Sequence, residues 1–302
     1  LRRHERTQIK AMNASSLSPY ALYRSLRAEL AAVYSPSEAA AMAEHYVCER
    51  LQLSRAQLLM DSPVALTAEE QSKIERDTQA LREQVPVQYV LGYETFGSRR
   101  FAVSPDVLIP RPETYELVEW CASALSQQTT PRLLDVGTGS GCIAVTLALE
   151  LPHAQVEAWD ISPRALTVAR HNAAQLGATV NFREVDLLKV IEEQAAEQRE
   201  YDLIVSNPPY IPAGEAPTMA DNVVQHEPHT ALFVPDHDPL LFYRALAVLV
   251  TERLRSGGAL LVETHTDFAL ATAELFAQHG LQSVEIRNDA DDRPRMAKAT
   301  RA

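Results

Sequence analysis

The sequence has little cysteine and no long hydrophobic segment. Its 302 residues include three cysteines, Cys48, Cys121 and Cys142, which are widely spaced and form no Cys-x-x-Cys pair. An odd and scattered set of thiols argues against a disulfide framework or a zinc ribbon. It is typical of a reducing compartment, so we expect a cytoplasmic protein. No apolar run approaches the roughly 18 to 20 residues that cross a bilayer, so we expect no membrane partner.

The sequence also lacks an excess of positive charge. Its 28 Lys and Arg residues are outnumbered by 40 Asp and Glu residues, which gives a formal net charge of -12 at pH 7. Because Lys and Arg supply the nonspecific affinity of proteins for nucleic-acid phosphates, this balance disfavours DNA or RNA as a partner. The hydrophobic fraction of 46% is that of an ordinary globular protein, and the length allows one large domain and one small one.

The chain does not begin with methionine. Its first residues, Leu1 to Arg6, are basic but no apolar core follows them, so we do not expect them to form a signal peptide. We expect residues 1–11 to be foreign to the native protein and Met12 to be its start.

The N-terminal part of the chain reads as helical. Residues from about 17 to 84 show no strand signal, and apolar residues such as Leu22 and Leu26 recur at helical spacing, which predicts that residues 1–85 hold a bundle of four or five helices. Such a bundle can be purely structural or can dock a macromolecular partner, and the pattern does not choose between them. Residues 86–110 follow, and Gly97-Ser98 between two alternating segments predicts a hairpin that links the two domains.

Residues 111–302 alternate between strand and helix patterns. This order predicts an α/β fold with a doubly wound, seven-stranded sheet that is mostly parallel. A first helix is expected from Tyr115 to Leu125, and the last two strands are expected to pair as an antiparallel hairpin at the sheet edge. The expected strands are 132–136, 155–159, 180–184, 202–206, 259–263, 283–287 and 296–300. The further expected helices are 142–151, 163–176, 187–196, 239–254 and 267–279.

A glycine-rich segment lies where the first of these strands meets its helix. The candidate cofactor loop consists of Asp135, Gly137, Thr138, Gly139, Ser140 and Gly141. Alternating glycines let the backbone turn tightly and approach a ligand closely. No Gly-Lys-Ser/Thr follows, so this is not a phosphate-binding P-loop, and Cys142 stands where the dinucleotide fingerprint has a glycine. An acid at the strand end followed by such a loop favours S-adenosylmethionine, which carries an amino acid and a ribose but no pyrophosphate.

Further acids follow the next two strands. Asp160 comes 19 residues after Gly141, where a carboxylate binds both ribose hydroxyls in nucleotide-binding sheets. Asp186 is placed to meet the adenine amino group, with Leu187 against the adenine ring. Each acid alone could simply cap a helix, but acids at the carboxyl ends of consecutive strands favour a cofactor site.

The fourth strand is followed by Asn207-Pro208-Pro209-Tyr210. Two prolines hold the chain extended and leave its carbonyl oxygens free to accept hydrogen bonds. The side-chain oxygen of Asn207 and the backbone oxygen of Pro208 can each accept one hydrogen of a planar NH2 group, and Tyr210 can cover its face. A lone Asn-Pro-Pro would be a rigid turn. Downstream of the glycine loop, it predicts a site for an NH2 substrate.

Other chemistries find little support. His226 and His229 are close together, but Pro228 lies between them and no helix pattern carries them, so we expect no metal site. We expect the segment 211–237, which contains them, to fold over the site as a lid. No nucleophile elbow is present and nothing marks a cysteine as activated.

Four segments together resemble the bacterial release-factor glutamine methyltransferases. They are Asp135 to Gly141, Asn207-Pro208-Pro209-Tyr210, Ile109-Pro110-Arg111-Pro112-Glu113-Thr114, and Glu227-Pro228 with Ala231-Leu232. The resemblance extends over nearly the whole chain. The Asn-Pro-Pro-Tyr motif is shared with adenine-amino methyltransferases, whereas the segment around Arg111 is the more specific sign.

The resemblance implies a class I methyltransferase sheet with an N-terminal domain that docks the substrate. It implies methyl transfer from S-adenosylmethionine, with S-adenosylhomocysteine as product, to the glutamine amide of the Gly-Gly-Gln motif in class I peptide-chain release factors. It assigns catalysis to Asn207, Pro208, Pro209 and Tyr210, which also bind the substrate. Arg111 and Glu113 are further substrate-binding residues, and Asn207 also contacts the cofactor. Alternatives are an adenine-amino DNA or RNA methyltransferase, a ribosomal-protein glutamine methyltransferase, and a non-enzymatic adaptor.

Overall fold

The computed structural model describes residues 15–190 and 200–302. The expected foreign segment 1–11, Met12 and the distal part of the expected helix 187–196 lie outside these residues. The chain divides into two compact units, one ending at Gly92 and the other beginning at Tyr93. Among the residues described, none of the helices has both the length and the apolar character of a membrane span.

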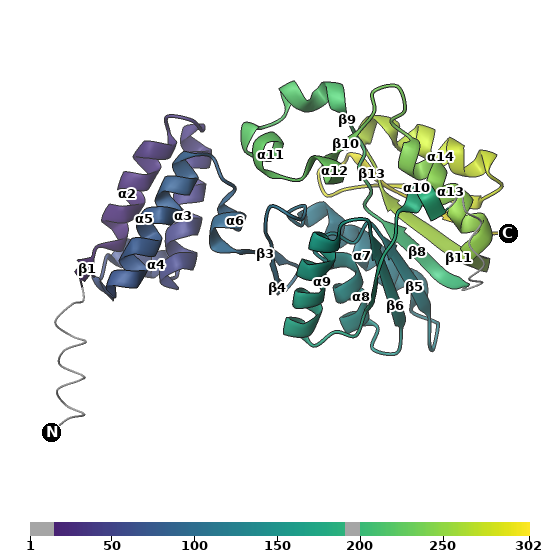
Figure 1. Ribbon diagram of the computed structural model, residues 1–302, viewed down its shortest axis with the longest axis horizontal. Helices are drawn as coiled ribbons and strands as arrows, with labels where there is room; N and C mark the ends of the chain where they lie inside the picture. Colours follow the sequence, from purple (N-terminus) through teal and green to yellow (C-terminus); the bar gives the residue numbers. More distant parts are fainter. Residues whose placement is uncertain (1–14, 191–199) are drawn as a thin grey trace. The chain divides into compact units, whose positions relative to one another are not determined.

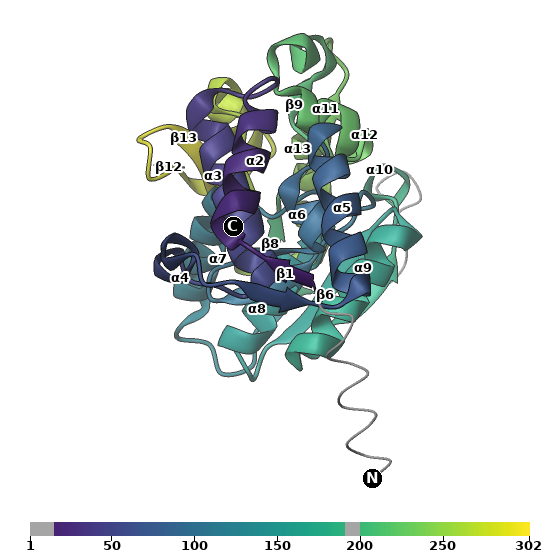
Figure 2. The same cartoon turned by 90° about the vertical axis from the view of Figure 1, so that its left-hand side faces the viewer.

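The first unit is built mainly from helices, which pack side by side (Figures 1 and 2). Its helices are α2 (Pro19–Leu30), α3 (Pro36–Leu51), α4 (Arg55–Met60), α5 (Ala68–Arg82) and α6 (Val87–Leu91). Ser35, Ser54 and Thr67 begin α3, α4 and α5 with reciprocal capping boxes, so short polar residues define where these helices start. Leu26 and Tyr46 are fully buried between the helices.

Two short strands were not expected in this unit. The strands β1 (Ser15–Leu17) and β2 (Val64–Leu66) pair antiparallel, with Leu17 opposite Val64. A three-residue strand is too short for the alternating pattern that identifies strands in a sequence. The expectation that residues from about 17 to 84 form no strand was therefore wrong at β2 and at Leu17, the last residue of β1.

The second unit begins with the expected hairpin. The strands β3 (Tyr93–Phe96) and β4 (Arg99–Ala102) pair antiparallel around Gly97, whose φ is 59°. Phe96 and Phe101 are buried in the same hydrophobic core as helix α7 (Pro112–Leu125). The hairpin therefore packs as part of the second unit, and the division of the chain falls before it.

The sheet of the second unit has seven strands in the order β12-β13-β11-β8-β5-β6-β7. Strands β5, β6, β7, β8 and β11 run parallel, and β13 pairs antiparallel with both β11 and β12. The bounds are β5 (Arg132–Val136), β6 (Gln155–Asp160), β7 (Asn181–Glu184), β8 (Tyr201–Ser206), β11 (Leu254–Glu263), β12 (Gln282–Asn288) and β13 (Pro294–Thr300). The predicted seven-stranded α/β architecture is confirmed.

Helices cover both faces of this sheet (Figure 1). They are α7, α8 (Cys142–Glu150) and α9 (Pro163–Leu176) on one face, and α10 (Leu187–Val190), α13 (Leu241–Arg253) and α14 (Ala269–Gln278) on the other. Successive strand residues point to opposite faces, so Leu133 packs with α7 and α8 while Leu134 packs with α13 and α14. Both faces are buried, which explains the nearly continuous apolar strands.

Between β8 and α13 the chain forms a segment whose first and last strands pair with each other. It contains β9 (Ile211–Pro212), the 3-10 helix η1 (Ala213–Thr218), α11 (Asp221–His226), α12 (His229–Leu232) and β10 (Phe233–Val234). β9 and β10 pair, with Ile211 opposite Phe233. The two ends of the segment are therefore held side by side.

Candidate active site

A cavity of about 400 Å³ lies within the second unit at the carboxyl ends of the parallel strands. This edge of a doubly wound sheet is where such folds bind ligands. Of the predicted site residues, the lining includes Arg111, Gly137, Thr138, Gly139, Ser140, Asp160, Asp186, Leu187, Asn207, Pro208 and Pro209. The lining does not include Asp135, Gly141, Glu113 or Tyr210.

The glycine loop is held against the end of β6. The backbone N–H groups of Gly137 and Thr138 both donate to the carbonyl oxygen of Trp159, at 2.9 Å each. Gly139 has φ 54° and Gly141 φ 81°, a left-handed conformation that favours glycine. A Cβ on Gly141 would lie 3.1 Å from the Cβ of Ala169, so this glycine also permits close packing of α8 against α9.

Asp135 lies beneath the loop rather than in the cavity wall. Its Oδ2 accepts hydrogen bonds from the Thr138 hydroxyl at 2.7 Å and from the Ala144 N–H at 3.2 Å. Its Oδ1 is buried and has no hydrogen-bond partner among the described residues. Burial raises the pKa of Asp135 to about 7. Its contacts show that this carboxyl group shapes the loop from behind.

The raised pKa of Asp135 makes a prediction about stability. Because the folded pKa lies above the reference value of 3.8, the folded state holds this proton more tightly than the unfolded state. The resulting stabilisation is complete below the unfolded pKa and is lost as the pH rises through about 7. Relative to D135N, the wild type should lose about 2 kcal/mol of unfolding free energy between roughly pH 5 and pH 7. Urea unfolding of both proteins across this range measures the difference, and parallel profiles would contradict the prediction.

Asp160 both supports the loop and faces the cavity. Its Oδ2 accepts from the Gly139 N–H and its Oδ1 from the Ser162 N–H, each at 2.8 Å. Burial raises the pKa of Asp160. Each carboxylate oxygen has a further lone pair for a ligand hydroxyl.

The far wall of the cavity has polar and apolar members. Asp186 accepts from the Leu188 N–H at 3.1 Å and pairs with Lys189 at 3.3 Å, and Leu187 lies beside it. Ile161 also lines the cavity and is 58% exposed despite its size, although the sequence analysis did not single it out. The sequence signal that could have identified Ile161 is its place directly after Asp160, the acid that ends β6. The apolar side chains of Ile161 and Leu187 suit a flat ring.

Asn207 has a defined orientation at the cavity edge. Its Nδ2 donates to the Thr114 hydroxyl oxygen at 3.1 Å, which turns Oδ1, on the other branch of the planar amide, away from Thr114. Pro208 and Pro209 line the same wall. Tyr210 is placed differently from the expectation: its hydroxyl donates to Glu263 Oε1 at 3.0 Å, and its ring meets His265 edge-on. A buried carboxylate needs hydrogen-bond donors, and Tyr210 supplies one from behind the cavity.

Glu263 is a functional candidate that the sequence analysis missed. It ends β11 and is buried, and its Oε2 accepts from the Thr114 hydroxyl at 2.6 Å. Its backbone oxygen accepts from the Tyr243 hydroxyl at 3.0 Å. Burial raises its pKa, against the hydrogen bonds from Thr114 and Tyr210, which favour the charged form. An acid at the carboxyl end of a parallel strand was the signal that could have identified it.

Arg111 reaches the cavity, whereas Glu113 does not line it. The Arg111 guanidinium forms an ion pair with Glu227, a buried acid of the segment after β8. The other oxygen of Glu227 accepts from the Ile109 N–H at 3.1 Å. One carboxylate therefore ties this segment to the chain that precedes α7.

The segment predicted to form a lid does contribute to the cavity wall. Pro228, Thr230, Ala231 and Phe233 line the cavity. His229 lies nearby, with its Nε2 at 2.7 Å from the Val224 carbonyl oxygen. Within residues 15–190 and 200–302, no three His, Cys, Asp or Glu side chains lie close enough together to hold a metal ion.

Comparison with known proteins decides the family. Residues 21–92 match the family described as PrmC N-terminal domain, and residues 119–230 match the Methyltransferase small domain. A protein of Bacteroides thetaiotaomicron named Release factor glutamine methyltransferase is 40% identical over 276 residues, covering 91% of this chain and 98% of the relative. The chain belongs to the release factor glutamine methyltransferase family. The resemblance predicted from its motifs is confirmed.

Other members of the release factor glutamine methyltransferase family match over similar lengths. The protein of that name from Neisseria gonorrhoeae is 41% identical, covering 84% of this chain and 89% of the relative. Among solved structures, the hMettl16 catalytic domain in complex with the MAT2A 3'UTR hairpin 6 matches with a TM-score of 0.52 and 17% identity, covering 80% of this chain and 85% of that one. This second likeness concerns the fold alone.

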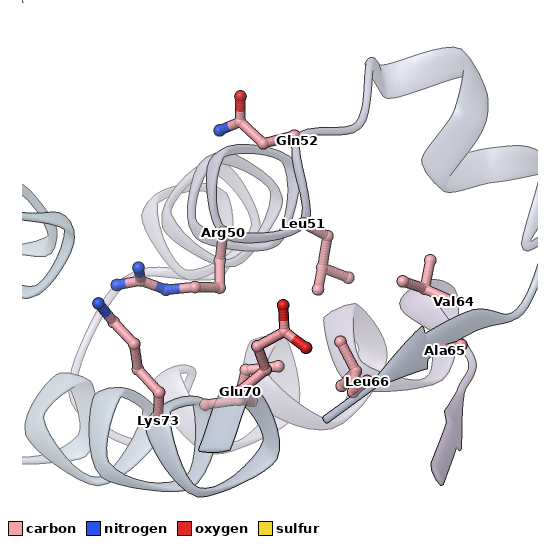
Figure 3. A pocket seen from close by; sticks show the side chains of 9 residues that line it. Arg50, Leu51, Gln52, Val64, Ala65, Leu66, Glu70 and Lys73 are labelled. Atoms are coloured by element: carbon pink, nitrogen blue, oxygen red, sulfur yellow. The ribbon is translucent and has the colours of Figure 1, made fainter. Parts of the chain in front are cut away.

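A smaller cavity of about 210 Å³ lies in the first unit, the part that matches the PrmC N-terminal domain (Figure 3). Arg50, Glu70 and Lys73 stand around it. Arg50 pairs with Asp77 at 2.6 Å and donates to the Val90 carbonyl, and Glu70 accepts from Thr67 at the start of α5. Arg50 therefore already holds α3 to α5 and α6, and Glu70 caps the start of its own helix α5.

Proposed function

We propose that this protein transfers a methyl group from S-adenosylmethionine to the side-chain amide of the glutamine in the Gly-Gly-Gln motif of class I peptide-chain release factors. The supporting observation is the orientation of Asn207. Its Nδ2 is engaged by Thr114, so its Oδ1 is the group available to an NH2 substrate in a cavity that the glycine loop also lines. Membership of the release factor glutamine methyltransferase family supports the choice of substrate.

The residues of the cavity fit S-adenosylmethionine. Asp160 offers acceptors for the two ribose hydroxyls, and Ile161 and Leu187 offer apolar surface for the adenine, beside Asp186 for its amino group. The loop from Gly137 to Ser140 presents backbone and small side chains to the amino acid portion. When bound, the cofactor supplies a methyl group on a positively charged sulfur, which keeps the bonding electron pair as the new N–C bond forms and the amide proton leaves to water.

The protein has to compensate for the poor reactivity of an amide nitrogen, whose lone pair is delocalised into the carbonyl. Holding the nitrogen in line with the methyl group is the first contribution, and for well-oriented reactants positioning supplies up to roughly 7 to 11 kcal/mol. The Oδ1 of Asn207 and the backbone oxygen of Pro208 are the second. They accept from the NH2 group and stabilise positive charge that develops on nitrogen.

Mass spectrometry of the Gly-Gly-Gln peptide tests the proposal. The full chain is incubated with S-adenosylmethionine and a class I release factor, and we expect the peptide to gain one methyl group on its glutamine. A release factor with that glutamine replaced by alanine is the matched control. Duplex DNA, RNA and ribosomal protein, assayed with labelled cofactor, cover the rival substrates. Methylation of one of these, without methylation of the release factor, would disprove the assignment.

A further inference from the structure

Thr114 connects the predicted substrate-binding amide to a buried carboxyl group. Its hydroxyl oxygen lies 2.6 Å from Glu263 Oε2 on one side and 3.1 Å from Asn207 Nδ2 on the other. Thr114 is only 2% exposed, although it contributes to the cavity wall. The three side chains come from α7, β11 and the turn after β8, so the arrangement depends on the fold of the whole sheet.

The direction of each hydrogen bond between Glu263, Thr114 and Asn207 follows from the chemistry of the three groups. A hydroxyl has one hydrogen to donate, and a carboxylate can only accept, so the Thr114 hydrogen points at Glu263. The Thr114 oxygen then offers Asn207 a lone pair, which an N–H can approach. The flipped amide would bring Asn207 Oδ1 against that lone pair and would leave the buried oxygen without a donor, which is costly.

Glu263 is itself fixed from other directions. The Tyr210 hydroxyl donates to its second oxygen at 3.0 Å, and the Tyr243 hydroxyl binds its backbone oxygen at 3.0 Å. Burial raises the pKa of Glu263, whereas the hydrogen bonds from Thr114 and Tyr210 and the positive charge of Arg295, which pairs with Asp289 at 3.2 Å, favour its ionised form. The carboxylate is therefore a fixed acceptor that determines the direction of the Thr114 hydroxyl.

We propose that Thr114 is a positioning residue, which Glu263 and Tyr210 hold in place so that it fixes the side-chain amide of Asn207 with Oδ1 toward the substrate NH2 group. Thr114 touches no reacting atom in this role. The inference rests on the proposed function, since it is the incoming NH2 that requires an acceptor and not a donor. In the flipped orientation Asn207 would present its own NH2 to that of the substrate, and the two would repel.

Substitutions at Thr114 test the role by kinetics. T114V keeps the shape but removes the hydroxyl, and T114S keeps the hydroxyl. We expect T114V to lower kcat by about tenfold, the cost of losing one hydrogen bond to a charged network, with KM for the release factor and the Kd of the cofactor within about twofold of wild type. T114S should restore most of kcat. Wild-type turnover in T114V, or equal loss in T114S and T114V, would overturn the proposal.

Combining variants separates orientation from general structure. In an N207A background there is no amide to orient, so adding T114V should leave the residual single-turnover rate unchanged. A further loss of the same size in both backgrounds would show that Thr114 acts independently of Asn207 and would refute the proposal. E263Q provides a second route, because its amide can donate to Thr114 and so permits the reversed hydrogen-bond direction. It should reproduce the loss seen in T114V.

A measurement without substrate distinguishes failure of this inference from failure of the proposed function. The side-chain NH2 of Asn207, assigned in NMR spectra of the full chain by its disappearance in N207A, should exchange slowly in wild type and T114S and faster in T114V. Unchanged exchange in T114V would overturn the inference whatever the substrate is. Slow exchange that depends on Thr114, together with an unmethylated release factor, would support the arrangement and refute the proposed reaction alone.

Discussion

Replacing Asn207 by alanine should lower the turnover of release factor methylation by roughly 10²- to 10³-fold, comparable to the loss of one preorganised donor in an oxyanion hole. The reason is that Asn207 Oδ1 and the Pro208 carbonyl are the two acceptors proposed for the substrate NH2, and alanine removes the one on a side chain. Most of the S-adenosylmethionine site consists of other residues, from the glycine loop to Leu187. The Kd of the cofactor should therefore change little.

Single-turnover kinetics and isothermal titration calorimetry measure the two quantities for N207A. Asn288 provides a matched control, because it is an exposed asparagine at the end of β12 whose Nδ2 binds Asp292. N288A should behave as wild type in both assays. If N207A loses cofactor affinity as strongly as it loses turnover, Asn207 is part of the cofactor site and the proposed division of roles is wrong.

Replacing Asp160 by alanine should weaken cofactor binding and leave turnover nearly unchanged, the reverse of the result expected for N207A. The variant loses the carboxylate proposed to bind the ribose and also the acceptor for the Gly139 N–H, which orders the loop. Hydrogen bonds to a charged group contribute about 1.5 to 3 kcal/mol each, so we expect the cofactor Kd to rise by roughly 10²-fold or more. At saturating cofactor, kcat should stay within about threefold of wild type, because Asp160 does not contact the proposed substrate amide.

Two further variants sharpen the result at Asp160. D160N keeps one acceptor oxygen and the shape of the side chain, so its Kd should lie between those of wild type and D160A. Asp236 also accepts a hydrogen bond from a glycine N–H, that of Gly214 at 2.6 Å, but it lies outside the cavity. D236A should bind the cofactor as wild type does. A normal Kd for D160A would place the ribose elsewhere.

The sheet and its ligand-binding edge were predictable because the signals for them are local. Strand β5 and helix α9 have the bounds expected from their sequence patterns, and the glycine loop lies at the junction between strand and helix. Strand β11 begins at Leu254, five residues before its expected start, and its pairing with β8 shifts register before Ala259. A register shift of this kind depends on the neighbouring strand, so one segment of sequence does not reveal it.

The directions of side chains in the site were less predictable. Tyr210 turns toward Glu263, 53 residues away in the chain, and Asn207 binds Thr114, 93 residues away. These partners meet only when the sheet has formed, so spacing along the sequence does not identify them. Asp135 shows the same limit, because its position at a strand end suggested ligand contact while its hydrogen bonds support the loop from beneath.

The pairing of Ile211 with Phe233 has a consequence for how the protein can vary. The ends of the intervening segment are held by this pairing, and its second half is also fixed by Glu227 and by the residues from Pro228 to Phe233 that line the cavity, so the part left free to vary is the outer surface around α11. Residues of α11 can therefore be exchanged, or the turn before it lengthened, without moving the corner that holds Asn207. The outer surface of α11 is thus free to diverge while the residues at the sheet edge stay the same.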